Sequence, residues 1–133
     1  MIVLDTHALL WWVSCDPRLS QPAFEAIERE LHADGGGVLV SAISAWEVAL
    51  LVDKGRLTLS MSTDDWLSTV EEIDGVQFAP LDVATAVEST RLPGEFHKDP
   101  ADRMIVALAR RFNAPLVTAD EKILAYRYVR TIW

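Results

Sequence analysis

Cysteine, basic residues and long hydrophobic runs are all scarce in this 133-residue sequence. The single cysteine, Cys15, has no partner for an internal disulfide, so a reducing cytoplasm is the expected location. Twelve lysines and arginines face twenty aspartates and glutamates, which gives a net charge of -8. The net negative charge of the protein therefore repels nucleic acid, and a contact with RNA or DNA requires metal ions or a local basic patch.

No stretch has the length or the leader pattern of a segment directed to a membrane. The longest apolar segment, residues 38–52, is interrupted by Glu47 and falls short of the roughly 20 residues that a membrane span needs. The first residues lack the basic region that opens a secretory signal peptide. We therefore expect a soluble protein that has no signal peptide and no membrane partner.

Short apolar runs alternate with helical periodicity along the whole chain. This alternation predicts one α/β/α domain over residues 1–133, with a mainly parallel central sheet flanked by helices. The expected strands are residues 2–5, 38–40, 76–79, 116–118 and 128–133. The expected helices are 6–13, from the cap Ser20 to about 32, from Ser41 or Ser44 to about 54, 63–73, 82–91, 100–112, and a short one capped by Asp120.

Four acidic residues stand where stability alone does not require them. Asp5 and Asp120 each close a buried strand and open a helix, and the carboxyl ends of parallel strands line the edge where ligands bind. Glu47 lies within the apolar face of its own helix, where an unpaired carboxylate is costly. Asp102 continues a buried helix face, while Asp99 is the better cap of that helix. The alternatives are a helix cap for Asp5, a salt bridge for Glu47 and a favourable helix N-terminus for Asp102.

Taken together, these acids predict a metal site. Carboxylates packed together repel one another, so they protonate or destabilise the fold unless a cation joins them. A carboxylate site without cysteine selects a hard ion, Mg²⁺ or Mn²⁺. The reaction suited to such a site is metal-assisted attack of water on a phosphodiester.

Four segments of the chain resemble the successive motifs of PIN-domain proteins. They read IVLDTHA (2–8), SAWEV (44–48), HKDPADR (97–103) and LVTAD (116–120). Within that family the chain is most similar to the VapC-type ribonuclease toxins of prokaryotic toxin–antitoxin pairs. The resemblance covers essentially the whole chain, and four motifs in this order are far more specific than any one of them.

The resemblance implies a divalent-metal-dependent endoribonuclease. Asp5, Glu47, Asp102 and Asp120 then form the catalytic acidic quartet and hold one or two Mg²⁺ ions, for which Mn²⁺ can substitute. Asp99 is a cap, a nearby acid or an outer metal ligand. Thr6 and Thr118 match small hydroxyl residues that support the site. The resemblance further implies an RNA substrate, a cognate antitoxin and a homodimer.

Basic residues near the proposed site are concentrated in the loop 91–103. The candidates for RNA contact are Arg91, His97, Lys98 and Arg103. The neighbours Trp11 and Trp12 cannot both face one core from a helix, so one of them is expected in a subunit contact.

Other functions need residues that the chain lacks. A haloacid-dehalogenase-type phosphatase requires Asp-x-Asp after the first strand, whereas Thr6 and His7 follow Asp5. A receiver-like signalling module requires paired acids at the same place. A catalytically inactive PIN-like binding module is the remaining alternative, and the complete quartet argues against it. The Gly35-Gly36-Gly37 segment lacks the Lys-Ser/Thr of a phosphate-binding loop and is interpreted as a turn.

Overall fold

The computed structural model describes all residues from 1 to 133, and every expected strand and helix is present. The strands are β1 (Ile2–Leu4), β2 (Val38–Ser41), β3 (Val76–Ala79), β4 (Leu116–Val117) and β5 (Thr131–Ile132). The helices are α1 (Thr6–Val13), α2 (Gln21–His32), α3 (Ala42–Asp53), α4 (Thr63–Glu71), α5 (Val83–Ser89), α6 (Pro100–Arg111) and α7 (Glu121–Leu124). The expected α/β class is confirmed.

All five strands run parallel in the order β3-β2-β1-β4-β5. Val3, in the central strand, is paired with Leu39 on one side and with Leu116 on the other. The chain order reverses between β1 and β4, so the carboxyl ends of these two strands border the crevice where ligands bind in such sheets. The register therefore brings the residues that follow β1 and β4 to one edge.

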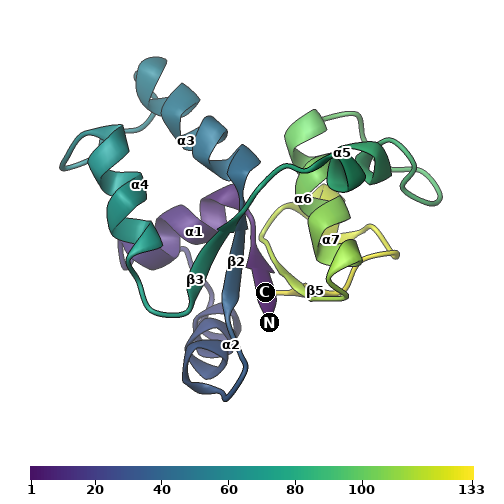
Figure 1. The fold of residues 1–133 in the computed structure, drawn as a ribbon, viewed down its shortest axis with the longest axis horizontal. Coiled ribbons are helices and arrows are strands. Elements are labelled where there is room, and N and C mark those ends of the chain that lie inside the picture. Colours follow the sequence, from purple (N-terminus) through teal and green to yellow (C-terminus); the bar gives the residue numbers. More distant parts are fainter.

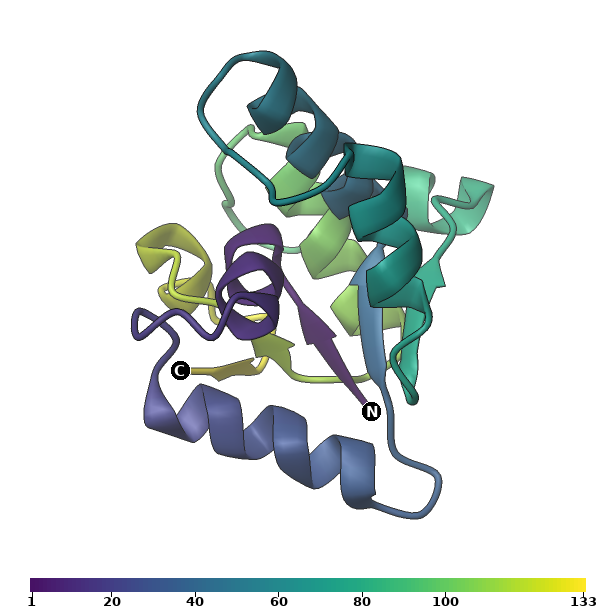
Figure 2. The same cartoon turned by 90° about the vertical axis from the view of Figure 1, so that its left-hand side faces the viewer.

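Helices cover both faces of the sheet, with α1 and α4 on one side and α5, α6 and α7 on the other (Figures 1 and 2). Side chains alternate between two cores, as expected for strands buried on both faces. Ile2 and Leu4 pack in the core under α1 to α4, whereas Val3 packs with Ile105 and Leu108 of α6. This double cover explains why the strands are continuously apolar in sequence.

The structure selects one of the two expected caps of α3, and it places the cap of α4 one residue before the expected start of that helix. Ser41, not Ser44, caps α3, and its hydroxyl oxygen accepts a hydrogen bond from the Ile43 amide at 3.2 Å. Ser62, not Thr63, caps α4. In both cases the capping residue keeps the extended backbone that a cap requires, whereas Ser44 and Thr63 lie within the helices.

The last strand is shorter than expected, because residues 127–129 form a turn and only Thr131–Ile132 pair with β4. An Arg110 guanidinium N–H donates to the Tyr128 carbonyl, which ties this turn to α6. None of the helices combines the length and the apolar character that crossing a bilayer requires.

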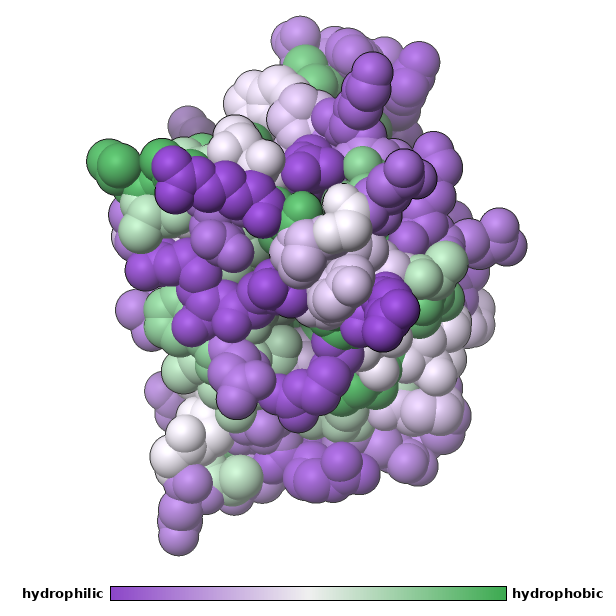
Figure 3. Space-filling view, turned by 90° about the vertical axis from the view of Figure 1, so that its right-hand side faces the viewer, coloured by the Kyte–Doolittle hydropathy of each residue, from purple (hydrophilic) through white to green (hydrophobic).

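The most exposed apolar residues include ones that the sequence analysis did not single out. Trp11 and Trp12 are both half-buried and pack against the core under α1 to α4, and their expected subunit contact stays a prediction. Trp46 and Val83 are instead the most exposed, at 56% and 81%. On the side formed by α5, α6 and α7, hydrophilic residues predominate and hydrophobic ones form small separate groups (Figure 3).

Gly36 marks a close approach between the turn before β2 and the end of α2. A Cβ atom at this position would lie 2.3 Å from the Glu30 carbonyl oxygen and 2.7 Å from its carboxylate. We expect Gly36→Ala to lower the free energy of unfolding by about 1–3 kcal/mol through overpacking, measured by urea denaturation. The control is Gly35→Ala, where a Cβ meets nothing within 4 Å and only the positive φ of 71° opposes it. A smaller loss for Gly36→Ala than for Gly35→Ala would contradict the steric account.

Candidate active site

Asp5 follows β1 and uses its two carboxylate oxygens for two different hydrogen bonds. One carboxylate oxygen caps α1 by accepting a hydrogen bond from the Ala8 amide at 2.8 Å. The other oxygen accepts a hydrogen bond from the hydroxyl of Thr118, at the end of β4. The residue is only 7% exposed. Burial raises the pKa of Asp5, while the hydrogen bonds from Thr118 and Ala8 oppose that rise.

Thr118 also connects Asp5 to Asp120. Its hydroxyl oxygen accepts a hydrogen bond from the Asp120 amide at 3.0 Å. The Asp120 carboxylate in turn caps α7, accepting from the amides of Lys122 at 2.9 Å and Ile123 at 3.1 Å. The buried Thr118 is thus hydrogen-bonded both to Asp5, which follows β1, and to Asp120, which follows β4.

Glu47 enters the site from α3 without forming a salt bridge. The ion pairs of the structure involve other acids, so the salt-bridge alternative for Glu47 is not realised. The Thr6 hydroxyl instead donates to Glu47 Oε1 at 2.6 Å and lies 2.9 Å from Ser44 Oγ. Burial raises the pKa of Glu47, the Thr6 hydrogen bond lowers it, and repulsion from Asp99 raises it further.

Asp99 and Asp102 divide the functions at the start of α6. Asp99 caps the helix by accepting a hydrogen bond from the Asp102 amide at 2.9 Å, as the sequence predicted for the better cap. The Asp102 carboxylate, relieved of capping, faces the other acids. Burial, and then repulsion from Asp99, Asp120 and further carboxylates, raises the pKa of Asp102 to about 7.

One open pocket of about 390 Å³ collects these side chains at the carboxyl edge of the sheet. It is lined by Asp5, Thr6, His7, Trp11, Glu47, Asp99, Asp102, Ile105, Ala119 and Asp120. The structure therefore brings together all four acids of the proposed quartet, with Asp99 beside them. The pocket is dominated by negative charge, so it suits a cation rather than an anion.

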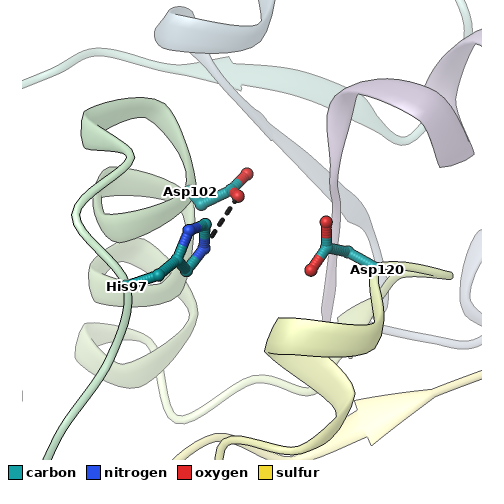
Figure 4. Close-up of side chains that lie close together, drawn as sticks. All are labelled: His97, Asp102 and Asp120. Carbon is teal, nitrogen blue, oxygen red and sulfur yellow. Dashed lines mark ion pairs between the residues drawn. The ribbon is translucent and has the colours of Figure 1, made fainter.

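His97 lies among the carboxylates, which the sequence interpretation did not foresee. Its Nε2 is 3.0 Å from Asp102 Oδ2, and donor atoms of His97, Asp102 and Asp120 all lie within 4.8 Å of one another (Figure 4). The sequence assigned His97 to a basic patch and the metal site to carboxylates alone. The available signal was its position at the start of the HKDPADR segment, five residues before Asp102.

The other candidates for RNA contact are placed differently from one another. The Arg103 guanidinium donates to the carbonyls of Ser89, Phe96 and His97 at 2.8, 3.1 and 3.2 Å, so it holds the loop rather than facing the pocket. Arg91 and Lys98 are exposed and do not line the pocket. Of the four residues expected to form a basic patch, only Arg91 and Lys98 are exposed cations.

Two lining residues, His7 and Trp11, were not predicted for the site. They are four residues apart on α1, and their rings lie 5.7 Å from each other. This helical spacing places them on one face, directly after Asp5 and Thr6, so the pattern was present in the sequence. The nearby His7 imidazole lowers the pKa values of both Asp5 and Glu47.

Two comparisons with known sequences match nearly the whole chain. Residues 2–128 match the model of the family described as PIN domain. The chain is 38% identical over 135 residues to Ribonuclease VapC22 of Mycobacterium tuberculosis, with 99% of this chain and 98% of that protein covered.

Two solved structures share the fold. VapBC2 from Rickettsia felis, bound to a DNA fragment from its promoter, matches with a TM-score of 0.72 and 17% identity over 98% of this chain and 97% of that one. A toxin–antitoxin complex from Klebsiella pneumoniae matches with a TM-score of 0.65 and 18% identity, covering 97% and 95%. At these identities the likeness shows the architecture alone.

The elevated pKa of Asp102 predicts a stability that falls with pH in the absence of metal. Because the folded-state pKa of about 7 exceeds the ordinary 3.8, the contribution of Asp102 is complete below pH 3.8 and is lost as the pH rises through about 7. We expect Asp102→Asn, which does not titrate, to gain stability relative to the wild type over this range. Urea denaturation of both proteins in EDTA measures the difference. A difference that stays constant from about pH 4 to pH 8 would contradict the crowding of carboxylates around Asp102.

Proposed function

The chain belongs to the PIN domain family, and on this premise we propose that it is a divalent-metal-dependent endoribonuclease and the toxin of a toxin–antitoxin pair. The observation that carries the proposal is the meeting of Asp5, Glu47, Asp102 and Asp120 in one pocket at the carboxyl edge of the sheet. The relative that is 38% identical over nearly the whole chain is a ribonuclease, which supports RNA as the substrate.

The side chains of the pocket fit a hard divalent ion. Carboxylates that raise one another's pKa, as around Asp102, are relieved by a bound cation, and oxygen donors suit Mg²⁺ and Mn²⁺. We assign the ion to the quartet, with Mg²⁺ as the cofactor and Mn²⁺ as a substitute. When bound, such an ion lowers the pKa of a coordinated water and neutralises the developing charge on a phosphate.

Two hydroxyls of the chain orient the carboxylates of Asp5 and Glu47 and oppose the rise in pKa that burial causes. The hydroxyl of Thr6 donates to Glu47, and that of Thr118 donates to Asp5, so each carboxylate is fixed in direction by a neighbour that favours its charged form. Asp99 completes the helix cap and adds negative charge beside Asp102. No serine or cysteine nucleophile is needed, because water is the attacking group.

RNA binding is expected to be weak and to depend on the metal. The chain carries a net charge of -8, and of the four candidate contacts only Arg91 and Lys98 remain exposed and free of the loop contacts that occupy Arg103. Few phosphates are therefore neutralised by protein side chains. A divalent ion held by the quartet would supply the main attraction for the scissile phosphate.

A cognate antitoxin is proposed as the protein partner, in line with the toxin–antitoxin complexes that share the fold. An inserted arginine or lysine would replace the metal electrostatically in the acidic pocket and block the phosphate. A homodimer stays a prediction. A cytoplasmic location is proposed on the ground of the single free cysteine, Cys15.

The first test separates the roles of Asp99 and Asp102. We expect Asp102→Asn to lower RNA cleavage by more than the roughly 10–100-fold that a supporting residue of a metal site costs, because it removes a ligand charge. Asp99→Asn should keep measurable activity, since asparagine also caps helices well. Cleavage of a fluorescent single-stranded RNA with Mn²⁺ measures both. A larger loss of cleavage in Asp99→Asn than in Asp102→Asn would show that the capping residue, Asp99, is the metal ligand.

The second test asks whether metal binds the folded state. A native-state ligand stabilises by about 2.7 kcal/mol at a hundredfold excess over its Kd. We therefore expect Mn²⁺ to raise the melting temperature of the wild type above its value in EDTA, and to raise that of Asp102→Asn much less. Asp82→Asn, a cap on α5 outside the pocket, is the matched control and should respond as the wild type does. Identical melting temperatures across a Mn²⁺ titration would exclude a carboxylate metal site.

A further inference from the structure

We propose that His97 supplies a nitrogen ligand to the metal ion held by Asp102 and Asp120, and that Arg103 is the residue that positions it. This inference rests on the metal-dependent function proposed above, and it adds to the acidic quartet a side chain of different chemistry. It also assigns to His97 and Arg103 a role other than RNA contact.

The donor atoms of His97, Asp102 and Asp120 lie close to the spacing that ligands of one ion require. They all lie within 4.8 Å of one another, and His97 Nε2 is 3.0 Å from Asp102 Oδ2. Adjacent ligands of an octahedral ion, each about 2.1 Å from the metal, lie about 3.0 Å apart, and opposite ligands lie about 4.2 Å apart. The Asp120 carboxylate points back toward His97 and Asp102 across the space between them (Figure 4).

The protein itself leaves His97 Nε2 without a hydrogen-bond partner. This nitrogen is buried, and although Asp102 is near, the two groups are not oriented for a hydrogen bond. Buried polar nitrogens are nearly always satisfied, and here the protein supplies an ion-pair contact with Asp102 but no hydrogen bond. A metal ion bound by the neighbouring carboxylates would give this nitrogen a partner, and neutral imidazole is a common protein ligand of transition-metal ions.

The loop that carries His97 is tied to the helix that carries Asp102. Arg103 of α6 donates to the carbonyls of Phe96 and His97, and also to that of Ser89. These bonds fix the backbone of His97 relative to the adjacent Asp102. A guanidinium used in this way sets a ligand's position without touching the ion.

Packing fixes the orientation of the ring as well. The Phe96 ring lies 4.5 Å from that of His97, edge to face, and 4.7 Å from that of Tyr126. The Tyr126 hydroxyl donates to the carbonyl of Pro93 and holds the start of the same loop. His97 is therefore held from its backbone and from its ring, as expected of a preorganised metal ligand.

A nitrogen ligand changes which ion the site prefers. Mg²⁺ favours oxygen donors only, whereas imidazole suits transition metals. We therefore expect His97→Gln to weaken Mn²⁺ binding by about 10-fold or more while changing Mg²⁺ binding much less. Isothermal titration calorimetry with each metal alone measures both affinities.

Pulsed electron paramagnetic resonance of the full chain loaded with Mn²⁺ identifies the ligand directly. We expect the spectrum of the wild type to contain the nitrogen coupling of a bound imidazole. The coupling should disappear in His97→Gln and persist in His7→Gln, which changes the histidine that lines the acidic pocket. Arg103→Ala should weaken or abolish the coupling while Mn²⁺ remains bound, because only the position of the ring is lost.

The outcomes distinguish the two proposals. Mn²⁺ that binds the wild type without nitrogen coupling, or a coupling that survives in His97→Gln, overturns the role of His97 and leaves the metal-dependent function standing. Full coupling in a folded Arg103→Ala, checked by circular dichroism, overturns the positioning role of Arg103. No binding of Mn²⁺ to the wild type overturns the proposed function itself and this inference with it.

Discussion

Repulsion between carboxylates gathered at one edge of the sheet is the constraint on which the rest of the structure depends. Parallel pairing of β1 with β4 brings Asp5 and Asp120 together, and helices α3 and α6 add Glu47 and Asp102. Hydroxyls and amides fix the carboxylates of Asp5, Glu47 and Asp120, and the Asp102 carboxylate is in contact with His97. The fold therefore stores unfavourable charge in the pocket, and a divalent ion is the species that removes it.

The same helix caps serve both stability and function. Asp5, Asp99 and Asp120 each accept amide hydrogen bonds at the start of a helix. A cap uses part of a carboxylate's accepting capacity, and the remaining lone pairs are available to a ligand. This arrangement explains why the acids could be interpreted in the sequence either as caps or as site residues: Asp5 caps α1 and also lines the pocket.

The strand ends could be predicted from sequence because parallel strands leave few arrangements open. Apolar runs locate β1 and β4, and the acid after each must then lie at the carboxyl edge. The place of His97 could not be predicted in the same way, because it belongs to a loop whose path depends on three carbonyls bound by Arg103. The burial of Trp11 and Trp12 depends likewise on helices distant in sequence.

The central claim is that one divalent ion occupies the pocket between the acids of β1, β4 and α6. An anomalous difference map from crystals containing Mn²⁺ tests it most directly. We expect a peak in contact with Asp102 and Asp120 at the carboxyl edge of the sheet, with Asp5 and Glu47 facing it. Anomalous density only at other acidic surfaces, or none in the pocket at saturating Mn²⁺, would contradict the account.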